Sequence, residues 1–248
     1  MNNFKLFGTK ISLTTNEKTL SIIKHYDFTK SNYICVLGLI EILEGYINKE
    51  LQDAFNGSYL NPLHSRAIEF YAKRRGYRDI KTLDPVWLLT KLLDEEVTHF
   101  FYGTNNKTLD KIKSKIEKQF PKAKIIGYKS PPFIGLDEIK DNGIIKREIE
   151  IINKQKPDII WISIGGLKQD LLMYHYNKYL DNGLMIGVGA VFDCFVGNIK
   201  LRPPWMKRMG LSWLYYLIQQ PKFRILKLTK LFHSLFLEFF KHTNNEAK

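Results

Sequence analysis

Short runs of β-branched and aromatic residues alternate in this chain with longer segments of helical periodicity, and this alternation restricts the fold more than any other feature. Five runs have the length and composition of buried strands: NYICVL (32–37), HFFYG (99–103), AKIIGY (123–128), DIIWISIG (158–165) and LMIGVGA (184–190). Amphipathic segments lie between them, as over residues 107–120, where apolar residues recur every three or four positions among lysines. This order predicts an α/β fold in which helices cover a mostly parallel sheet.

The net charge and the cysteines limit the possible partners and cellular compartment of the protein. A formal net charge of +13 favours an anionic partner, which can be nucleic acid, an anionic membrane or a phosphorylated substrate. No recognisable nucleic-acid motif accompanies the charge, so we do not expect nucleic-acid binding. Cys35 and Cys194 lie far apart in apolar stretches, which favours buried thiols over a disulfide or a metal site. No apolar run has the length of a signal peptide or a membrane span, so a cytoplasmic, non-spanning protein is expected.

The composition changes after Lys200, which divides the chain into an expected α/β body (1–200) and a basic C-terminal appendage (201–248). Between residues 201 and 241 there are eight lysines and arginines but a single acid, Glu238, and many aromatic residues lie among them. The last part, residues 225–241, reads as an amphipathic helix with an apolar stripe. Two interpretations stay open: a segment that lies in a membrane interface, or a terminal helix docked on its own domain.

Glycine turns after three of the expected strands are candidate binding sites. In IWISIGGLKQD (160–170), Gly165 and Gly166 precede a polar helix start, where free backbone N–H groups suit a phosphate, and Lys168 adds a cation. Gln169 can hydrogen-bond to a sugar or base. An ordinary tight turn needs the same glycines equally.

Two further turns have the same ambiguity. In GVGAVFDCFVG (187–197), Asp193 is a lone carboxylate in apolar company, and it either stabilises a turn or contacts the hydroxyls of a ribose or sugar. Gly103 and Thr104 follow a strand and precede a helix, which suits a phosphate but is also common punctuation.

The order and spacing of these stretches resemble the WecB/TagA/CpsF proteins, glycosyltransferase family 26. SIGGLKQD is similar to the Gly-x-Pro-Lys-Gln-Glu turn of the family, with Leu167 in place of proline and Asp170 in place of glutamate. GVGAVFD and KLRPPWMKRMGLSWLYY resemble its two later segments, and the similarity continues through LIQQPKFR.

This resemblance implies a Rossmann-like body that transfers a sugar, with inversion, from a UDP-linked N-acetylhexosamine such as UDP-N-acetylmannosamine. The implied acceptor is a saccharide on a polyprenyl diphosphate, in the synthesis of a cell-surface polysaccharide such as a capsule, teichoic acid or exopolysaccharide. It also implies a peripheral location on the inner face of the cell membrane and catalysis without a metal or other cofactor. The sequence leaves the oligomeric state open, a homo-oligomer included.

The resemblance assigns residues to two sites. Nucleotide-sugar binding falls on Gly103, Thr104, Gly165, Gly166, Lys168, Gln169, Asp170, Gly187, Gly189, Phe192 and Asp193. Contact with the diphosphate and the membrane falls on Arg202, Trp205, Lys207, Arg208, Lys222 and Arg224, because several cations can neutralise a multiply charged group.

The N-terminal half departs from the family pattern. With ELQDAFN (50–56) as an anchor, the Thr-x-Asn of the family falls on Val36 and Gly38, and its Gly-x-Asp falls near Pro85 and Trp87. Its Pro-Asp-Gly, which holds the expected general base, places His64 at the aspartate. A histidine can also take a proton from an acceptor hydroxyl, because its usual pKa is near 6.5. The alternative is a homologue that binds a nucleotide sugar but has lost or changed its chemistry and acts as a partner protein.

Overall fold

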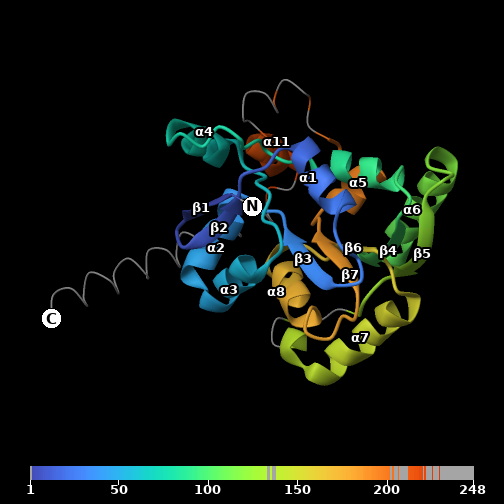
Figure 1. The fold of residues 1–248 in the computed structure, drawn as a ribbon. Helices are drawn as coiled ribbons and strands as arrows, with labels where there is room; N and C mark the ends of the chain where they lie inside the picture. Colours follow the sequence, from blue (N-terminus) through green and yellow to red (C-terminus); the bar gives the residue numbers. More distant parts are fainter. Residues whose placement is uncertain are drawn as a thin grey trace.

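A five-stranded parallel sheet forms the centre of the computed structural model, which describes residues 2–132, 135, 138–201, 203, 206, 212–219, 221, 225 and 229 (Figure 1). The strand order is β3-β7-β6-β4-β5 and every neighbouring pair is parallel. The five strands are β3 (Ser31–Cys35), β4 (Thr98–Gly103), β5 (Lys124–Lys129), β6 (Ile159–Ser163) and β7 (Gly183–Gly187). The predicted α/β fold is therefore confirmed, and each predicted strand forms within a few residues of its expected limits.

Helices cover both faces of the sheet and create two hydrophobic cores. Neighbouring strand residues point to opposite faces, so Tyr33 and Cys35 belong to one core and Ile34 to the other. The first core is covered by α2 (Leu39–Ile47), α3 (Lys49–Gly57), α7 (Asn142–Gln155) and α8 (Gly166–Tyr176). The second is covered by α1 (Asn16–Lys24), α5 (Pro85–Leu93), α6 (Asn106–Gln119) and α9 (Val191–Phe195). Burial on both faces explains why the strands read as nearly continuous apolar runs.

An antiparallel hairpin of β1 (Asn3–Leu6) and β2 (Thr9–Ser12) opens the chain. Phe7 and Gly8 form its turn with φ values of 49° and 77°, which is the left-handed backbone that two-residue hairpins require. The hairpin packs on the first core and was not predicted from the sequence. The remaining elements are α4 (Arg66–Arg74), a 3₁₀ turn η1 (Glu138–Lys140) and α11 (Ser212–Gln219).

Two further expectations from the sequence concern the burial of the cysteines and the absence of a membrane-spanning helix. Cys35 is fully buried as expected, whereas Cys194 is only partly buried. In the part of the chain that the structure describes, no helix has both the length and the hydropathy that crossing a bilayer requires.

Candidate functional site

The candidate site lies at the edge of the sheet where the parallel strands end. β4 and β6 are neighbours, but the chain leaves β4 for β5 on one side and leaves β6 for β7 on the other. The loops after these two strands therefore diverge, and open α/β sheets bind ligands at such a switch point. The two loops carry Gly103–Thr104 and Gly165–Gly166, so the fold brings two of the predicted glycine turns together at this position.

Gly165 and Gly166 adopt left-handed backbone at the start of α8. Their φ values are 75° and 63°, and a Cβ added to either would meet no atom within 4 Å. The need for glycine is thus conformational rather than steric. The turn opens the helix at Gly166, whose first N–H groups and positive dipole end suit an anionic group such as a phosphate.

Gly103, by contrast, is required by close packing. A Cβ at Gly103 would stand 2.3 Å from the Ser163 carbonyl oxygen, and the φ of 125° is also unfavourable for other residues. The next residue, Thr104, has a φ of 54° and donates its N–H to the same Ser163 oxygen at 2.9 Å. Ser130 Oγ donates to the Thr104 carbonyl at 2.7 Å. The ends of β4 and β6 are therefore fixed against each other.

Gln169 joins the start of α8 to the loop after β7. Its Oε1 accepts the Gly189 N–H at 2.9 Å, and Ser163 Oγ donates to the Gly189 carbonyl at 2.6 Å. A Cβ at Gly187 would stand 2.6 Å from Gln169 Nε2, so the position of the Gln169 side chain requires glycine at residue 187. Gln169 is only 6% exposed, and the bond that the structure shows for it holds a loop. Its contact with a sugar remains a prediction.

Asp170 is also buried, at 4% exposure, and lies beside Cys35 at the end of β3. Burial, together with the charge of Asp170 and its hydrogen bond to the thiol, raises the pKa of Cys35 well above its usual range. The thiol is therefore an uncharged donor to this carboxylate. Lys168, two residues before Asp170, is partly exposed in the first turn of α8, where a cation can meet an anion bound at the helix start.

Phe192 and Asp193 stabilise α9 and the turn that follows it. The Phe192 ring is completely buried and lies 5.3 Å from the ring of Phe101 in the second core, so its side chain supports the loop after β7 from beneath. Asp193 Oδ1 accepts from Asn198 Nδ2 at 2.9 Å, which is the turn-stabilising contact that the sequence left open. A ligand contact of either residue stays a prediction.

His64 lies at the same edge of the sheet, beyond β3. The segment before it runs parallel to β3, with bridges from Leu60 to Ile34 and from Leu63 to Leu37. The His64 N–H donates to the Leu37 carbonyl at 2.6 Å. Strands lie about 4.8 Å apart, so the His64 backbone stands about 10 Å from the loop after β7, two strand positions away.

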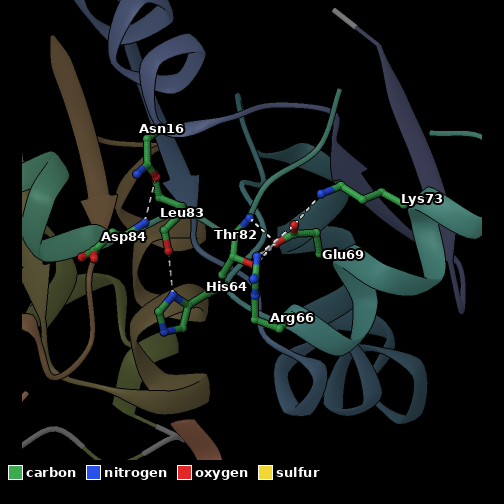
Figure 2. Close-up of polar contacts among 8 residues, drawn as sticks. All are labelled: Asn16, His64, Arg66, Glu69, Lys73, Thr82, Leu83 and Asp84. Atoms are coloured by element: carbon green, nitrogen blue, oxygen red, sulfur yellow. Dashed lines mark hydrogen bonds and ion pairs between the residues drawn. The ribbon is translucent and has the colours of Figure 1, made fainter. Parts of the chain in front are cut away.

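One hydrogen bond fixes the protonation pattern of the His64 ring. The distance from His64 Nδ1 to the Leu83 carbonyl oxygen is 3.0 Å (Figure 2). Because a carbonyl can only accept, Nδ1 carries the hydrogen, and the basic lone pair of the neutral ring is on Nε2. His64 is exposed. An exposed imidazole with its basic nitrogen defined in this way is suited to proton transfer.

The segment that holds His64 is itself held by a buried carboxylate, Glu69. Glu69 accepts from Arg66 at 3.0 Å, from Lys73 at 2.7 Å and from both the N–H and the hydroxyl of Thr82 (Figure 2). Burial alone would raise the pKa of Glu69, but these bonds outweigh burial and lower that pKa to about 2. The carboxylate is therefore charged at any physiological pH, and it fixes the residue before Leu83.

Neighbours fix the segment on its other side as well. The Leu83 N–H donates to the Leu63 carbonyl at 2.7 Å, and the Asp84 N–H donates to Asn16 Oδ1 at 3.0 Å. Asp84 also caps α5 by accepting the Trp87 N–H. The Leu83 carbonyl that orients His64 is thus held from both directions along the chain.

Two features of this site were not predicted from the sequence: the contacts between Glu69 and Thr82, and the position of Glu41. Arg66, Glu69 and Lys73 have the spacing of helical ion pairs, but nothing in the sequence indicates the bonds from Glu69 to Thr82. Glu41 is the second: its Oε2 accepts the Gly38 N–H at 3.1 Å, which places a carboxylate at the end of β3. Its position three residues after Gly38, in the first turn of α2, was the available signal.

The predicted diphosphate and membrane residues cannot be placed. Arg202, Trp205, Lys207, Arg208, Lys222 and Arg224 lie outside the described residues, as does most of the basic C-terminal stripe. Among the residues that are described, no group of three His, Cys, Asp or Glu side chains could hold a metal ion.

A surface hollow of about 560 Å³ lies away from the glycine turns, along the lysine face of α6. Two of its lysines have partners within the protein: Lys111 Nζ donates to Asn198 Oδ1 at 2.7 Å, and Lys115 Nζ donates to the Phe195 carbonyl. The hollow is open to solvent, and we do not assign it to the site.

Comparison with known proteins identifies the family to which this chain belongs. Residues 4–245 match the family described as "Glycosyl transferase WecG/TagA/CpsF family". The chain is 31% identical over 122 residues, 49% of its length and 44% of the relative, to an "N-acetylglucosaminyldiphosphoundecaprenol N-acetyl-beta-D-mannosaminyltransferase" of Bacillus subtilis (strain 168). A protein of the same name from Bacillus spizizenii is 27% identical over 141 residues, 54% of this chain and 50% of the relative. The match spans about half the length of these relatives, whereas the family match covers nearly the whole chain, which therefore belongs to the WecG/TagA/CpsF glycosyltransferases.

Proposed function

We propose that this protein is an inverting glycosyltransferase that moves an N-acetylhexosamine-type sugar, N-acetylmannosamine or a relative of it, from UDP to a saccharide on a polyprenyl diphosphate. The family match over residues 4–245 carries the proposal, and the names of the two relatives support the choice of donor and acceptor class. The product would enter a cell-surface polysaccharide, with the enzyme acting peripherally at the inner face of the cell membrane.

In this proposal the donor lies across the ends of β4, β6 and β7. Its diphosphate meets the N–H groups at the start of α8 and the side chain of Lys168, and its remaining parts lie against the loops of Gly103 and Gly189. Metal independence is part of the proposal, because backbone amides and lysine can supply the positive potential that a diphosphate needs.

His64 is the proposed general base. The acceptor hydroxyl oxygen attacks the anomeric carbon, the bond from that carbon to the UDP oxygen breaks, and UDP leaves with the electron pair. The proton of the hydroxyl passes to His64 Nε2, the nitrogen that the Leu83 bond leaves basic. A positioned base of this kind contributes about a hundredfold to ten-thousandfold in rate.

The test is release of UDP from UDP-N-acetylmannosamine and related UDP-sugars in the presence of a polyprenyl-diphosphate-linked N-acetylglucosamine. His64→Ala is expected to lower kcat by about a hundredfold or more. His64→Asp, which restores the residue type expected in the family, should recover part of the rate and move the ascending limb of the pH profile to lower pH, because a carboxylate is a weaker base than an imidazole. A chelator should leave the rate unchanged.

Glu41→Gln is the matched comparison, because it removes the charge of a carboxylate at the neighbouring strand end without changing the size of the side chain. If Glu41→Gln abolishes transfer while His64→Ala is nearly normal, the base is Glu41 and our assignment is wrong.

The alternative, a homologue that binds a nucleotide sugar without transferring it, has one observation in its favour. Val36 and Gly38, at the end of β3, stand where the family places polar residues, and the structure puts these positions at the same edge as His64. Calorimetry separates the two functions: binding of UDP-sugars with no transfer to any acceptor supports the alternative, and absence of nucleotide binding contradicts both.

A further inference from the structure

The outer side of α4 and the turn after it (residues 66–79, called here the α4 surface) combines exposed aromatic rings with clustered arginines. Phe70 is 60% exposed, Tyr71 41% and Tyr77 38%. Residues 73–79 form an uninterrupted exposed run. Scattered exposed rings are ordinary on protein surfaces, but a group of three on one short segment indicates an interaction site.

Cations lie directly against these rings. The Arg74 guanidinium is 4.7 Å from the centre of the Phe70 ring, and that of Arg75 is 5.3 Å from the Tyr71 ring. Arg78 is also exposed. Aromatic rings at head-group depth beside arginines that reach phosphates are the combination that interfacial helices present to anionic lipid.

The acidic residues of the segment do not oppose this charge equally. Of the two acids in residues 66–79, Glu69 is turned inward and bound to Arg66 and Lys73. Asp79 is exposed, so the outer side carries Arg74, Arg75 and Arg78 against this one carboxylate. The sign of the surface therefore favours an anionic partner.

The inner side of α4 fixes the helix on the body. Ile68 and Ala72 are buried in the first core, and Glu69 ties the helix to Thr82. In Figure 1, α4 projects from the rest of the molecule at its periphery. Phe70 and Tyr71 are thus presented by a helix that is held in place, and they follow His64 by six and seven residues in the chain.

We infer that the α4 surface docks on the anionic face of a lipid bilayer. The choice of a bilayer rests on the proposed function in one respect: an acceptor carried by a polyprenyl diphosphate resides in the membrane, and the base that receives its proton must come near it. Docking through a helix that begins two residues after His64 meets this requirement directly.

Vesicle co-sedimentation of the full chain tests the inference. The vesicles contain phosphatidylcholine alone or phosphatidylcholine mixed with phosphatidylglycerol. Each basic residue near an anionic surface contributes about fivefold to partitioning, so Arg74→Glu/Arg75→Glu should weaken binding to the mixed vesicles by roughly tenfold or more. Phe70→Ser should weaken binding, while Phe70→Trp should preserve it, because tryptophan favours the interface.

Lys113→Glu/Lys118→Glu is the matched control, with the same change in net charge on the exposed side of α6. Selective loss of binding in the α4 variants supports the inference. Equal losses in both pairs would show that binding follows net charge alone, and unchanged binding in the α4 variants would show that another segment carries it; either result overturns the inference. Retention of the protein on DNA, with the same α4 dependence but no vesicle binding, also overturns it.

Vesicle binding needs neither donor nor acceptor, so it stands or fails separately from the transferase activity. If the protein is a transferase, the α4 variants should lose transfer to an acceptor in vesicles and keep transfer to a short-chain acceptor in solution. Absence of transfer in both settings, with vesicle binding intact, contradicts the proposed function and leaves the docking surface in place.

Discussion

The Glu69 network offers a quantitative test, because one buried carboxylate there has several partners. The perturbation is Glu69→Gln, which keeps the shape and one acceptor oxygen for Thr82 but removes the charge that Arg66 and Lys73 bind. The pKa of Glu69 is about 2 in the folded protein, against an ordinary 4.5. At about 1.4 kcal/mol per pKa unit, the bonds to the charged form contribute roughly 3 kcal/mol as an upper limit.

Solvent screening reduces this figure. The Arg66 and Lys73 side chains are 45% and 41% exposed, so we expect Glu69→Gln to lower the free energy of unfolding by about 2 kcal/mol at neutral pH. The folded pKa lies below the unfolded one, so this stability is fully present above pH 4.5 and is lost as the pH falls towards 2. The difference between wild type and variant should therefore shrink in acid.

Urea unfolding followed by circular dichroism, at neutral pH and near pH 3.5, measures both quantities. The control is Glu150→Gln, which breaks an ion pair with Lys154 of similar length, 2.8 Å, whose side chains are 63% and 70% exposed; exposed pairs contribute little. A loss at Glu69 no larger than at Glu150, or a loss that stays constant as the pH falls, would refute the reasoning.

Three further predictions concern the loops of the site. Thr82→Val should shift the tautomer balance of the His64 ring, measured by ¹⁵N NMR of labelled histidine. Thr98→Val is the control and should leave the ring unchanged, because Thr98 makes the same pair of bonds to a different carboxylate, Asp158. An unchanged His64 spectrum in Thr82→Val would show that the Glu69 network does not control the ring. Gly103→Ala should lower the free energy of unfolding by about 2 kcal/mol or more, because the added Cβ meets backbone atoms of Ser163 and the φ of residue 103 is positive. Gly187→Ala should cost less stability, since it meets only the ends of Gln169 and Met173, but should weaken UDP-sugar binding measured by calorimetry if the Gln169 bond to Gly189 shapes the donor site.

The strands could be predicted because their residues are buried on both faces. Ile159, Ile160, Trp161 and Ile162 are all inaccessible to solvent, and such a run leaves a signal that any reader of the sequence can detect. The hairpin of β1 and β2 was missed because each strand has four residues, too few for a clear alternation.

The composition of the site depends on contacts that sequence cannot show. Strand order decides that the loops after β4 and β6 diverge, and this order arises from packing between distant segments. Likewise, the sequence marked His64 as isolated, with no acid within the surrounding ten residues 59–68. Thr82, which links the ring to Glu69, is 13 residues from that carboxylate, a separation at which no helical or strand periodicity applies.

The proposed role of His64 as the base requires rigid surroundings. A carboxylate has two equivalent oxygens, so it can accept a proton in either of two orientations, whereas a neutral imidazole has one basic nitrogen. An imidazole that serves as a base therefore needs a partner that fixes both its tautomer and its direction, as the Leu83 carbonyl does here. In that role the buried charge of Glu69, which accepts five hydrogen bonds, has a use beyond stability, because it holds the segment from which that carbonyl projects. A carboxylate at position 64 would not need this support, so Thr82→Val should lower the transfer rate of the wild type but leave that of His64→Asp unchanged.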